Sequence, residues 1–187
     1  MDRRVKYTKK IIKDTFLELL NEKDIKKITV SEICTKADIN RATFYRYYLD
    51  VFDLLEQIEK DFVAELTAAY TPENDNEKTI SHFSKAMLEV FLKNKELVKI
   101  LFNTNNNIYF LNNILEVAYT HCKERWEKDL PDISEEEMEY ATVFIFNGAL
   151  GIINYWVQND FDKDIDEIAA MVEKLSSYGT RKYIYKK

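Results

Sequence analysis

The sequence predicts an all-α fold, and three observations support this prediction. The chain of 187 residues holds only 3 glycines and 2 prolines, so it has little of the material that tight hairpin turns require. Apolar residues recur at helical spacing in successive segments. Several of these segments begin with a side chain that can cap a helix. The chain is also long enough to bury a sizeable core.

The first helix is predicted from Thr8 to Leu20, with Thr8 as its N-cap. Its apolar residues form one stripe: Ile12, Phe16, Leu19 and Leu20. Asp24 is expected to end the helix, because Asp tolerates the left-handed backbone conformation better than most non-glycine residues. Residues 1–13 hold six Lys and Arg against one Asp. Such a basic segment is typical of nucleic-acid binding, but equally of a solvated tail.

Two short helices joined by a tight turn are predicted next. Thr29 to Glu32 has the form of a capping box, a hydroxyl followed three residues later by Glu, and therefore predicts a helix start. Asp38 and Ile39 predict the turn, and Asn40 is expected to cap a second helix over residues 41–48. This order of elements is the helix-turn-helix arrangement.

The second helix carries side chains suited to DNA. A major groove admits one helix, Arg pairs with guanine, and Thr and Tyr hydroxyls reach phosphate oxygens. An isolated segment of this composition would more often be an amphipathic helix with packed aromatics and solvated arginines. The surrounding helix-turn-helix pattern favours the DNA-binding interpretation.

These motifs resemble those of the TetR/AcrR family of transcriptional regulators. The resemblance covers roughly residues 8–56 and is carried by three segments, Thr29-Val30-Ser31-Glu32-Ile33-Cys34, Ala37-Asp38-Ile39-Asn40 and Thr43-Phe44-Tyr45-Arg46-Tyr47-Tyr48. It implies a three-helix DNA-binding domain at residues 1–49 and a larger helical domain for effector binding and dimerisation at residues 50–187. About nine helices are expected in total.

The resemblance also implies which residues contact DNA. The residues expected to face bases are Arg41, Ala42 and Arg46. Those expected to contact the DNA backbone are Thr29, Thr43, Tyr45 and Tyr47, with further phosphate contacts from Lys6 and Lys9.

Three residues depart from the family pattern. Asp38 stands where the family usually has Gly in the turn, and Leu49 and Val51 stand where Lys is usual after the recognition helix. Asp38 can still adopt the required backbone, whereas Leu49 and Val51 remove expected phosphate contacts. We expect these departures to change the affinity for DNA but not to abolish DNA binding.

The rest of the chain predicts six further helices. The first is capped by Asp50 and runs to about Tyr70, with an apolar stripe at Phe52, Leu55, Ile58, Phe62 and Leu66. The others are expected at about residues 78–93, 95–102, 108–128, 134–158 and 165–178. Residues 1–60 hold 13 basic and 11 acidic side chains, and residues 61–187 hold 14 and 22, so the two parts are expected to face different partners.

The stretch from Ala141 to Val157 is apolar nearly all round. A membrane span needs about 20 apolar residues and tolerates polar side chains poorly, so the polar residues of this stretch favour a buried helix of a soluble protein. One monomer offers limited cover for it, and we expect one face to pair with a second subunit in a four-helix interface. The predicted dimer residues are Gly148, Ile152, Ile168, Val172 and Leu175.

The middle of the chain is rich in aromatic residues. In the resembled family this region often encloses a small-molecule pocket, although aromatics at helical spacing are more often plain core. The predicted lining residues are Phe83, Met87, Phe91, Phe102, Phe110, Tyr119, Trp126 and Phe144.

Neither a metal site nor a catalytic site is predicted. Cys34, Cys122, His82 and His121 are too sparse to form either, and no phosphate-binding or nucleophile motif occurs. We therefore expect no cofactor, no metal and no enzyme activity. The charged N-terminal segment and the two cysteines predict a reduced, cytoplasmic protein without membrane contact.

The expected function is that of a homodimeric, sequence-specific regulator that represses transcription from a palindromic operator in double-stranded DNA until an unknown effector releases it. Two alternatives stay open. Residues 146–156 are similar to a branch of the family that includes an activator of dihydroxyacetone kinase genes, which is controlled by another protein. The other alternative is a helical adaptor that acts without DNA.

Overall fold

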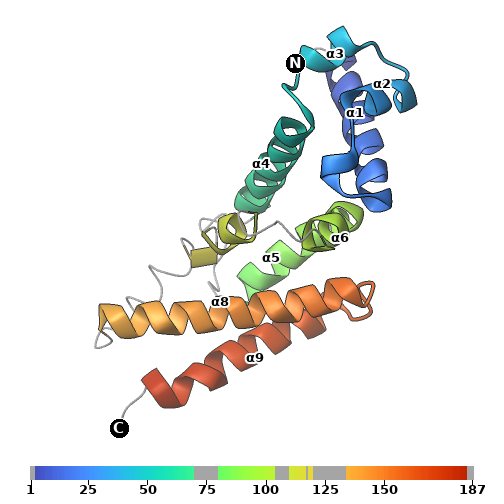
Figure 1. Cartoon of the computed structure of the whole chain (residues 1–187). Coiled ribbons are helices and arrows are strands. Elements are labelled where there is room, and N and C mark those ends of the chain that lie inside the picture. Colours follow the sequence, from blue (N-terminus) through green and yellow to red (C-terminus); the bar gives the residue numbers. More distant parts are fainter. Residues whose placement is uncertain (1–2, 70–79, 104–109, 117, 120–133, 185–187) are drawn as a thin grey trace. The chain divides into compact units, whose positions relative to one another are not determined.

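The computed structural model describes residues 3–69, 80–103, 110–116, 118–119 and 134–184. Within these ranges the chain forms helices, turns and loops and contains no strand, which confirms the all-α prediction (Figure 1). The chain divides into two compact units, which are described separately. The division between the units falls between Phe62 and Val63, inside the helix Val51–Ala69. The predicted domain boundary, between residues 49 and 50, lies just before the start of this helix.

The first unit contains α1 (Arg3–Glu22), a 3-10 helix (Ile25–Lys27), α2 (Val30–Lys36), α3 (Arg41–Tyr45) and the first part of α4 (Val51–Ala69). The helix-turn-helix is thus present as predicted. The side chains at its centre are fully buried: Ile12, Phe16, Ile33, Phe44 and Leu54.

The predicted limits of the first helix were wrong at both ends. α1 begins at Arg3, and the Thr8 hydroxyl donates a hydrogen bond of 3.0 Å to the carbonyl of Arg4 inside the helix instead of capping it. The basic residues before Thr8 therefore belong to the first turns of α1. Asp24 has φ −56°, which is not left-handed, and its carboxylate caps the 3-10 helix by accepting from the Lys26 amide at 2.8 Å.

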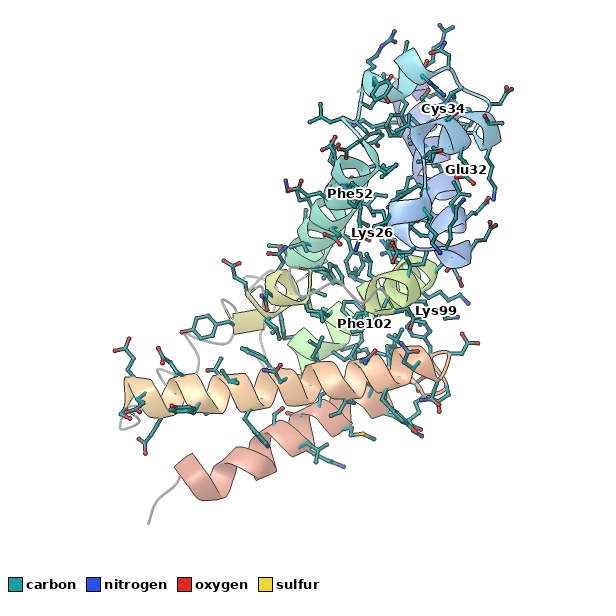
Figure 2. All side chains as sticks on the ribbon, in the orientation of Figure 1. Lys26, Glu32, Cys34, Phe52, Lys99 and Phe102 are labelled. Atoms are coloured by element: carbon teal, nitrogen blue, oxygen red, sulfur yellow. The ribbon has the colours of Figure 1, made fainter. Side chains whose placement is uncertain are left out.

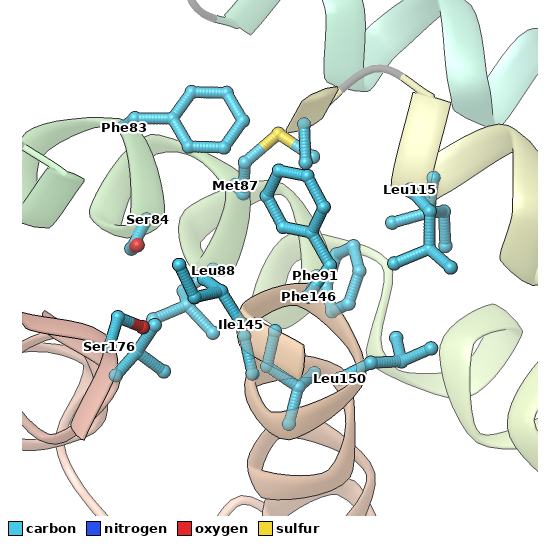
Figure 3. Close-up of a pocket in the computed structure, with 15 residues that line it drawn as sticks. Phe83, Ser84, Met87, Leu88, Phe91, Leu115, Ile145, Phe146, Leu150 and Ser176 are labelled. Carbon is cyan, nitrogen blue, oxygen red and sulfur yellow. The ribbon is translucent and has the colours of Figure 1, made fainter. Parts of the chain in front are cut away.

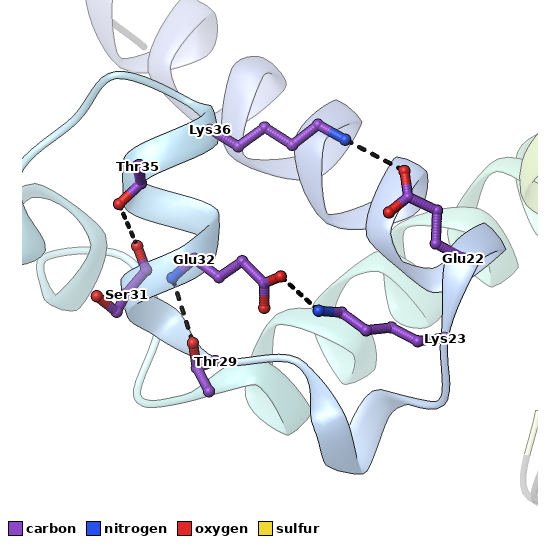
Figure 4. A network of polar contacts seen from close by, with 7 residues as sticks. All are labelled: Glu22, Lys23, Thr29, Ser31, Glu32, Thr35 and Lys36. Atoms are coloured by element: carbon purple, nitrogen blue, oxygen red, sulfur yellow. Dashed lines mark hydrogen bonds and ion pairs between the residues drawn. The ribbon is translucent and has the colours of Figure 1, made fainter.

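Polar contacts fasten α2 to the end of α1 (Figure 4). The Thr29 hydroxyl accepts from the Glu32 amide at 3.2 Å, as predicted for the N-cap. The Glu32 carboxylate pairs with Lys23, which lowers the pKa of Glu32, and the backbone of Thr29 adds a smaller lowering contribution. Lys36 pairs with Glu22 at 3.5 Å.

The turn between α2 and α3 is closed without glycine. Asp38 adopts the left-handed conformation with φ 50°. The Ile39 amide donates to the Cys34 carbonyl at 3.0 Å, and the Asp38 amide donates to the Thr35 carbonyl at 3.4 Å. These two bonds satisfy the last carbonyls of α2 in the pattern of a Schellman motif.

The N-termini of α3 and α4 are both capped by the predicted residues. Asn40 accepts from the Thr43 amide at 2.7 Å, although α3 ends at Tyr45, three residues earlier than predicted. Asp50 accepts from the amides of Phe52 and Asp53 at 2.8 and 2.9 Å.

The predicted apolar stripe of α4 was wrong at its first member. The Phe52 side chain is 52% exposed (Figure 2), whereas Val51 and Leu54 are buried. The Asp50 cap sets the position of the first turn, and from there the buried face includes Val51 and Leu54 and leaves Phe52 outside.

The second unit contains the rest of α4, α5 (Ile80–Lys93), most of α6 (Lys95–Asn103), a helical run at residues 110–116 and 118–119, α8 (Glu135–Gln158) and α9 (Ile165–Ile184). Both α5 and α8 pack against α9 (Figure 1). α8 begins with a complete capping box, in which Ser134 accepts from the Glu137 amide at 3.2 Å and Glu137 accepts from the Ser134 amide at 3.3 Å.

A buried cluster joins α5, α8 and α9. Its members are Leu88, Trp156, Ile168, Ala169 and Val172. The Trp156 indole donates to the Lys163 carbonyl at 2.9 Å, and its ring meets that of Phe161 edge to face at 4.8 Å. These contacts close the connection between α8 and α9.

We expect Asn40→Ala to lower the free energy of unfolding by ~1 kcal/mol, because the first turn of α3 loses its side-chain acceptor. Asn40→Asp retains an acceptor oxygen and should stay within a few tenths of a kcal/mol of the natural chain. Urea unfolding followed by far-UV circular dichroism measures both changes. An equal loss in the two variants would show that the cap oxygen is not the cause.

Candidate nucleic-acid interface and apolar pocket

The outer surface of α3 carries the residues predicted to contact DNA. Arg41, Ala42, Tyr45 and Arg46 are exposed, whereas Phe44 is fully buried and anchors the helix. Thr43 and Tyr47 are half-buried at the same helix and just after it. Thr29 is exposed at the N-terminus of α2, where its hydroxyl already accepts from the Glu32 amide. Thr43 is also engaged, because its hydroxyl donates to Asn40 at 2.9 Å.

A hydrogen bond holds Arg41 against α2. Its guanidinium Nη2 donates to the Ser31 hydroxyl oxygen at 2.8 Å. An arginine has many rotamers, and this contact restricts them before any DNA is bound. Sequence reasoning missed Ser31, since the two residues lie ten positions apart and only the turn at Asp38 brings them together.

Lys9 brings positive charge from α1 to the end of α3. Its ammonium nitrogen lies 5.7 Å from the ring centre of Tyr47 and 5.6 Å from that of Tyr48. Both distances suit a cation–π interaction. Lys6 is exposed one turn earlier on the same helix. Lys6 and Lys9 are thus two of the cationic side chains of α1, and Arg41 and Arg46 are the cationic side chains of α3 and its C-cap.

The two residues after α3 that depart from the family pattern have different surroundings. Val51 is buried and belongs to the core of the first unit. Leu49 is 79% exposed, and its amide donates to Asp53 at 2.7 Å. Packing therefore accounts for an apolar residue at position 51, whereas the structure offers no such reason for Leu49.

Tyr48 and Cys34 lie inside the first unit. The Tyr48 ring packs against Phe44 at 5.6 Å, and burial, with smaller effects of Asp61 and Asp53, raises the pKa of Tyr48 to about 12. Burial also raises the pKa of the Cys34 thiol, which keeps it protonated and unreactive.

An apolar pocket lies in the second unit, between α5, α8, α9 and the helical run that contains Ile114 (Figure 3). Its empty volume is about 690 Å³, part of which is open to solvent. The described lining residues are Phe83, Ser84, Met87, Leu88, Phe91, Ile114, Leu115, Ala118, Ile145, Phe146, Ala149, Leu150, Ile153, Val172 and Ser176.

Three of the predicted pocket residues lie in this lining, Phe83, Met87 and Phe91. Phe102 and Phe110 pack edge to face on each other at 6.4 Å, outside the lining. Tyr119 packs against Phe146. The prediction for Phe144 was wrong, because its side chain is 63% exposed. Trp126 lies outside the described residues.

The side of α8 away from the pocket exposes large apolar side chains. They are Tyr140, Val143, Phe144 and Tyr155, and α9 adds Met171 and Leu175. A Cβ atom at Gly148 or Gly151 would meet no atom within 4 Å, so this surface is open. We call these eight residues the α8–α9 face. α8 is also long and apolar enough to span a membrane by length and composition. One third of an apolar 18-residue stretch of this helix is buried.

The predicted dimer residues divide between this face and the interior. Gly148 and Leu175 lie on the α8–α9 face. Ile152 is partly buried against the cluster around Trp156. Ile168 and Val172, also predicted as dimer residues, belong to that cluster and are buried within one chain, so they do not lie on the α8–α9 face. The stripe of α9 that they form is used for packing within one chain.

No group of three or more potential metal ligands gathers in the described part of the chain.

A helix-turn-helix with an exposed cationic helix, joined to a helical unit that holds an apolar pocket, defines the class of helix-turn-helix regulators. Residues 78–178, more than half of the chain, match a TetR-type family model described as "Transcriptional regulator C-terminal region". The chain therefore belongs to the TetR family of transcriptional regulators.

A curated relative and several solved structures agree with this assignment. YxbF of Bacillus subtilis (strain 168), an HTH-type transcriptional regulator, is 38% identical over 92 residues, which are 46% of this chain and 23% of that protein. The chain thus matches about a quarter of the length of YxbF.

Among solved structures, the fold is similar to a putative TetR-family regulator from Syntrophomonas wolfei, with TM-score 0.74 and 18% identity over 97% of this chain and 99% of that one. It is also similar to the dihydroxyacetone kinase operon activator DhaS, with TM-score 0.66 and 20% identity over 93% and 96% of the two chains. A complex of SmeT with triclosan has TM-score 0.66 and 15% identity over 92% and 91%. At these identities the likeness concerns the fold.

We expect Tyr48→Phe to reduce the loss of stability between pH 10 and pH 12. The folded chain holds the Tyr48 proton up to about pH 12, whereas the unfolded chain releases it near pH 10, so its contribution is complete below pH 10 and is lost as the pH rises through 12. Urea unfolding at several alkaline pH values measures the slope. Tyr45→Phe, at a 56% exposed residue, is the control that should leave the slope unchanged.

Proposed function

We propose that the chain is a homodimeric, sequence-specific DNA-binding regulator that represses transcription from a palindromic operator and is released by a small-molecule effector. The observation that carries the proposal is the exposed surface of α3, where Arg41 and Arg46 stand free of the core and Arg41 is already oriented by Ser31. The regulator acts in the cytoplasm and has no enzymatic role in this proposal.

In the proposed complex, α3 enters the major groove. Arg41, Ala42 and Arg46 contact base edges, and Arg is the side chain that pairs with guanine through two hydrogen bonds. Thr29, Thr43, Tyr45 and Tyr47 contact the DNA backbone, and Lys6 and Lys9 add phosphate contacts from α1. The rings of Tyr47 and Tyr48 keep the Lys9 ammonium close to the end of α3, which supports a role for this lysine at the flank.

A dimer formed through the α8–α9 face would bury the apolar side chains that one chain leaves exposed. Gly148 and Gly151 allow two α8 helices to approach closely, because neither carries a side chain. Pairing by a two-fold axis would place two α3 helices about one DNA turn apart, ~34–36 Å, which matches a palindromic site.

The apolar pocket is the proposed effector site. α4 is continuous across the division between the two units, and Glu65 in its second half is tied to the end of α5. Lys93 Nζ lies 2.6 Å and Asn94 Nδ2 3.1 Å from the Glu65 carboxylate oxygens. A shift of α5 on ligand binding would therefore move α4, and with it the DNA-binding unit.

The presence of the pocket favours a small molecule over a protein as the controlling partner. The alternative of a protein partner rests on the similarity of residues 146–156 to a family branch, and a chain of that kind needs no cavity. Here Phe83, Met87 and Phe91 line such a cavity.

The alternative of a DNA-independent adaptor makes a different prediction. An adaptor of that kind would keep its function after Arg41→Ala combined with Arg46→Ala.

The first test is selection from a random-sequence DNA pool with the purified chain at two salt concentrations. Recovery of one palindromic motif, with binding that falls steeply as salt rises, would support a dimeric operator-binding protein. Recovery of no sequence above background, with and without added ligands, would overturn the DNA-binding part of the proposal.

We expect Arg41→Ala to relax base preference by ~1–3 kcal/mol at one position of each half-site, because a bidentate contact to a base is lost. Lys9→Ala should weaken all sequences alike and reduce the salt slope by about 1 per subunit. Competition binding against single-base variants of the selected operator measures both. An unchanged preference in Arg41→Ala would contradict the base assignment.

Leu175→Asp should raise the dimer dissociation constant by at least about tenfold, because it places an unpaired charge in an apolar interface. Leu92→Asp is the control, because Leu92 is also an exposed leucine, at 39% against 56% for Leu175, and lies on α5 outside the α8–α9 face. Sedimentation equilibrium measures both. An unchanged dimer in Leu175→Asp would locate the interface elsewhere, and a monomeric natural chain would overturn the dimer.

A further inference from the structure

The lining of the apolar pocket, as far as its residues are described, is almost free of polar groups. Of its 15 described residues, 13 are apolar and two, Ser84 and Ser176, carry hydroxyls. None carries a charge. A ligand with an ionised group would lose its hydration in this pocket without gaining a counter-charge, which costs several kcal/mol.

The charged residues that neighbour the lining along α5 are directed elsewhere. Lys85 follows Ser84, but its ammonium pairs with Asp166 of α9 at 2.6 Å. This ion pair raises the pKa of Lys85 and keeps its charge occupied. Glu89 follows Leu88 and is exposed. The helical phase that directs Ser84, Leu88 and Phe91 inward directs these charges away from the pocket.

The polar side chains in the described lining of the pocket both carry hydroxyls. Ser84 from α5 and Ser176 from α9 lie at one side of it (Figure 3). Thr142 lies on α8 one helical turn before Ile145 and Phe146, and its buried hydroxyl oxygen has no hydrogen-bond partner among the described residues. A buried hydroxyl without a partner is costly, and a ligand group that bonds to it would recover that cost.

From this lining we infer that the effector is an uncharged, mostly aromatic or aliphatic molecule with one or two hydrogen-bonding groups, and that ionised molecules of the same size are rejected. The inference rests on the proposed effector function of the pocket. It names the class of ligand that the pocket takes: a neutral molecule whose polar group bonds to hydroxyls and whose body contacts Phe83, Phe91 and Phe146.

A pair of fluorescent probes tests the class directly. N-phenyl-1-naphthylamine is neutral, whereas 8-anilino-1-naphthalenesulfonate has the same ring system and carries a sulfonate anion. We expect the neutral probe to bind the full-length chain with a dissociation constant at least about tenfold lower, the charge being the only large difference between the two probes.

Two substitutions place this preference in the pocket. Ser84→Lys introduces a cation into the lining and should shift the ratio of the two affinities toward the sulfonate by about tenfold or more. Ser84→Asp should shift the ratio in the opposite direction. Leu92→Lys, on the same helix but outside the lining, should leave the ratio unchanged. Circular dichroism establishes that each variant is folded before its ratio is measured.

The outcomes separate the inference from the proposed function. Equal or tighter binding of the sulfonate by the natural chain would overturn the inference and leave the effector pocket in place. A ratio that responds to Leu92→Lys as strongly as to Ser84→Lys would overturn it as well, because the probes would then bind outside the pocket. Binding of neither probe would overturn the effector pocket, while the DNA selection would still test operator binding separately.

Discussion

The chain has to turn sharply between helices with almost no glycine, and both units depend on how it does so. The last carbonyls of a helix need donors, and the left-handed residue that supplies them is usually glycine. Here Asp38 and Asp160 take that conformation, with φ 50° and 59°, and Phe161 follows at 58°. A left-handed non-glycine residue costs roughly 1–2 kcal/mol. The packing of Phe161 on Trp156 offsets this cost at the second turn, and hydrogen bonds to the α2 carbonyls offset it at the first.

Helix phase then decides which chemistry each helix offers. In α8, residues three or four positions apart share a face, so Ile145, Phe146 and Ala149 line the pocket while Phe144 and Gly148 face outward. The same apolar composition thus serves two surfaces of one helix. This explains why α8 is apolar nearly all round and yet only partly buried in a single chain. It also separates the proposed effector site from the proposed dimer surface, since no residue of the α8–α9 face belongs to the described pocket lining.

Most features that depend on a few neighbouring residues could be predicted from the sequence, with the limits of α1 as the exception, whereas several features that depend on packing could not. The caps at Thr29, Asn40 and Asp50 follow from side chains within three positions of the helix start, and all three are present. The choice between Phe144 and Phe146 depends on which side of α8 packs against Leu115, Ala118 and Tyr119. Likewise, the apolar stripe of α9 is the same whether it packs inside one chain or against another, so the sequence could not assign Ile168 to the core.

In the proposed mechanism, an effector can shift the chain only by the difference in its affinity for two conformations, which for allosteric proteins is typically 1–3 kcal/mol. An uncharged ligand gains its affinity mainly from apolar contact, which is not directional. The difference in its affinity for the two conformations therefore has to come mainly from a difference in the shape of the cavity. Leu88 and Val172 line the cavity and also belong to the cluster around Trp156. A ligand that fits only when α5 moves therefore acts on the helix whose far end is held to Glu65 of α4. In this arrangement the ion pair between Lys93 of α5 and Glu65 carries the displacement of α5 onward to α4.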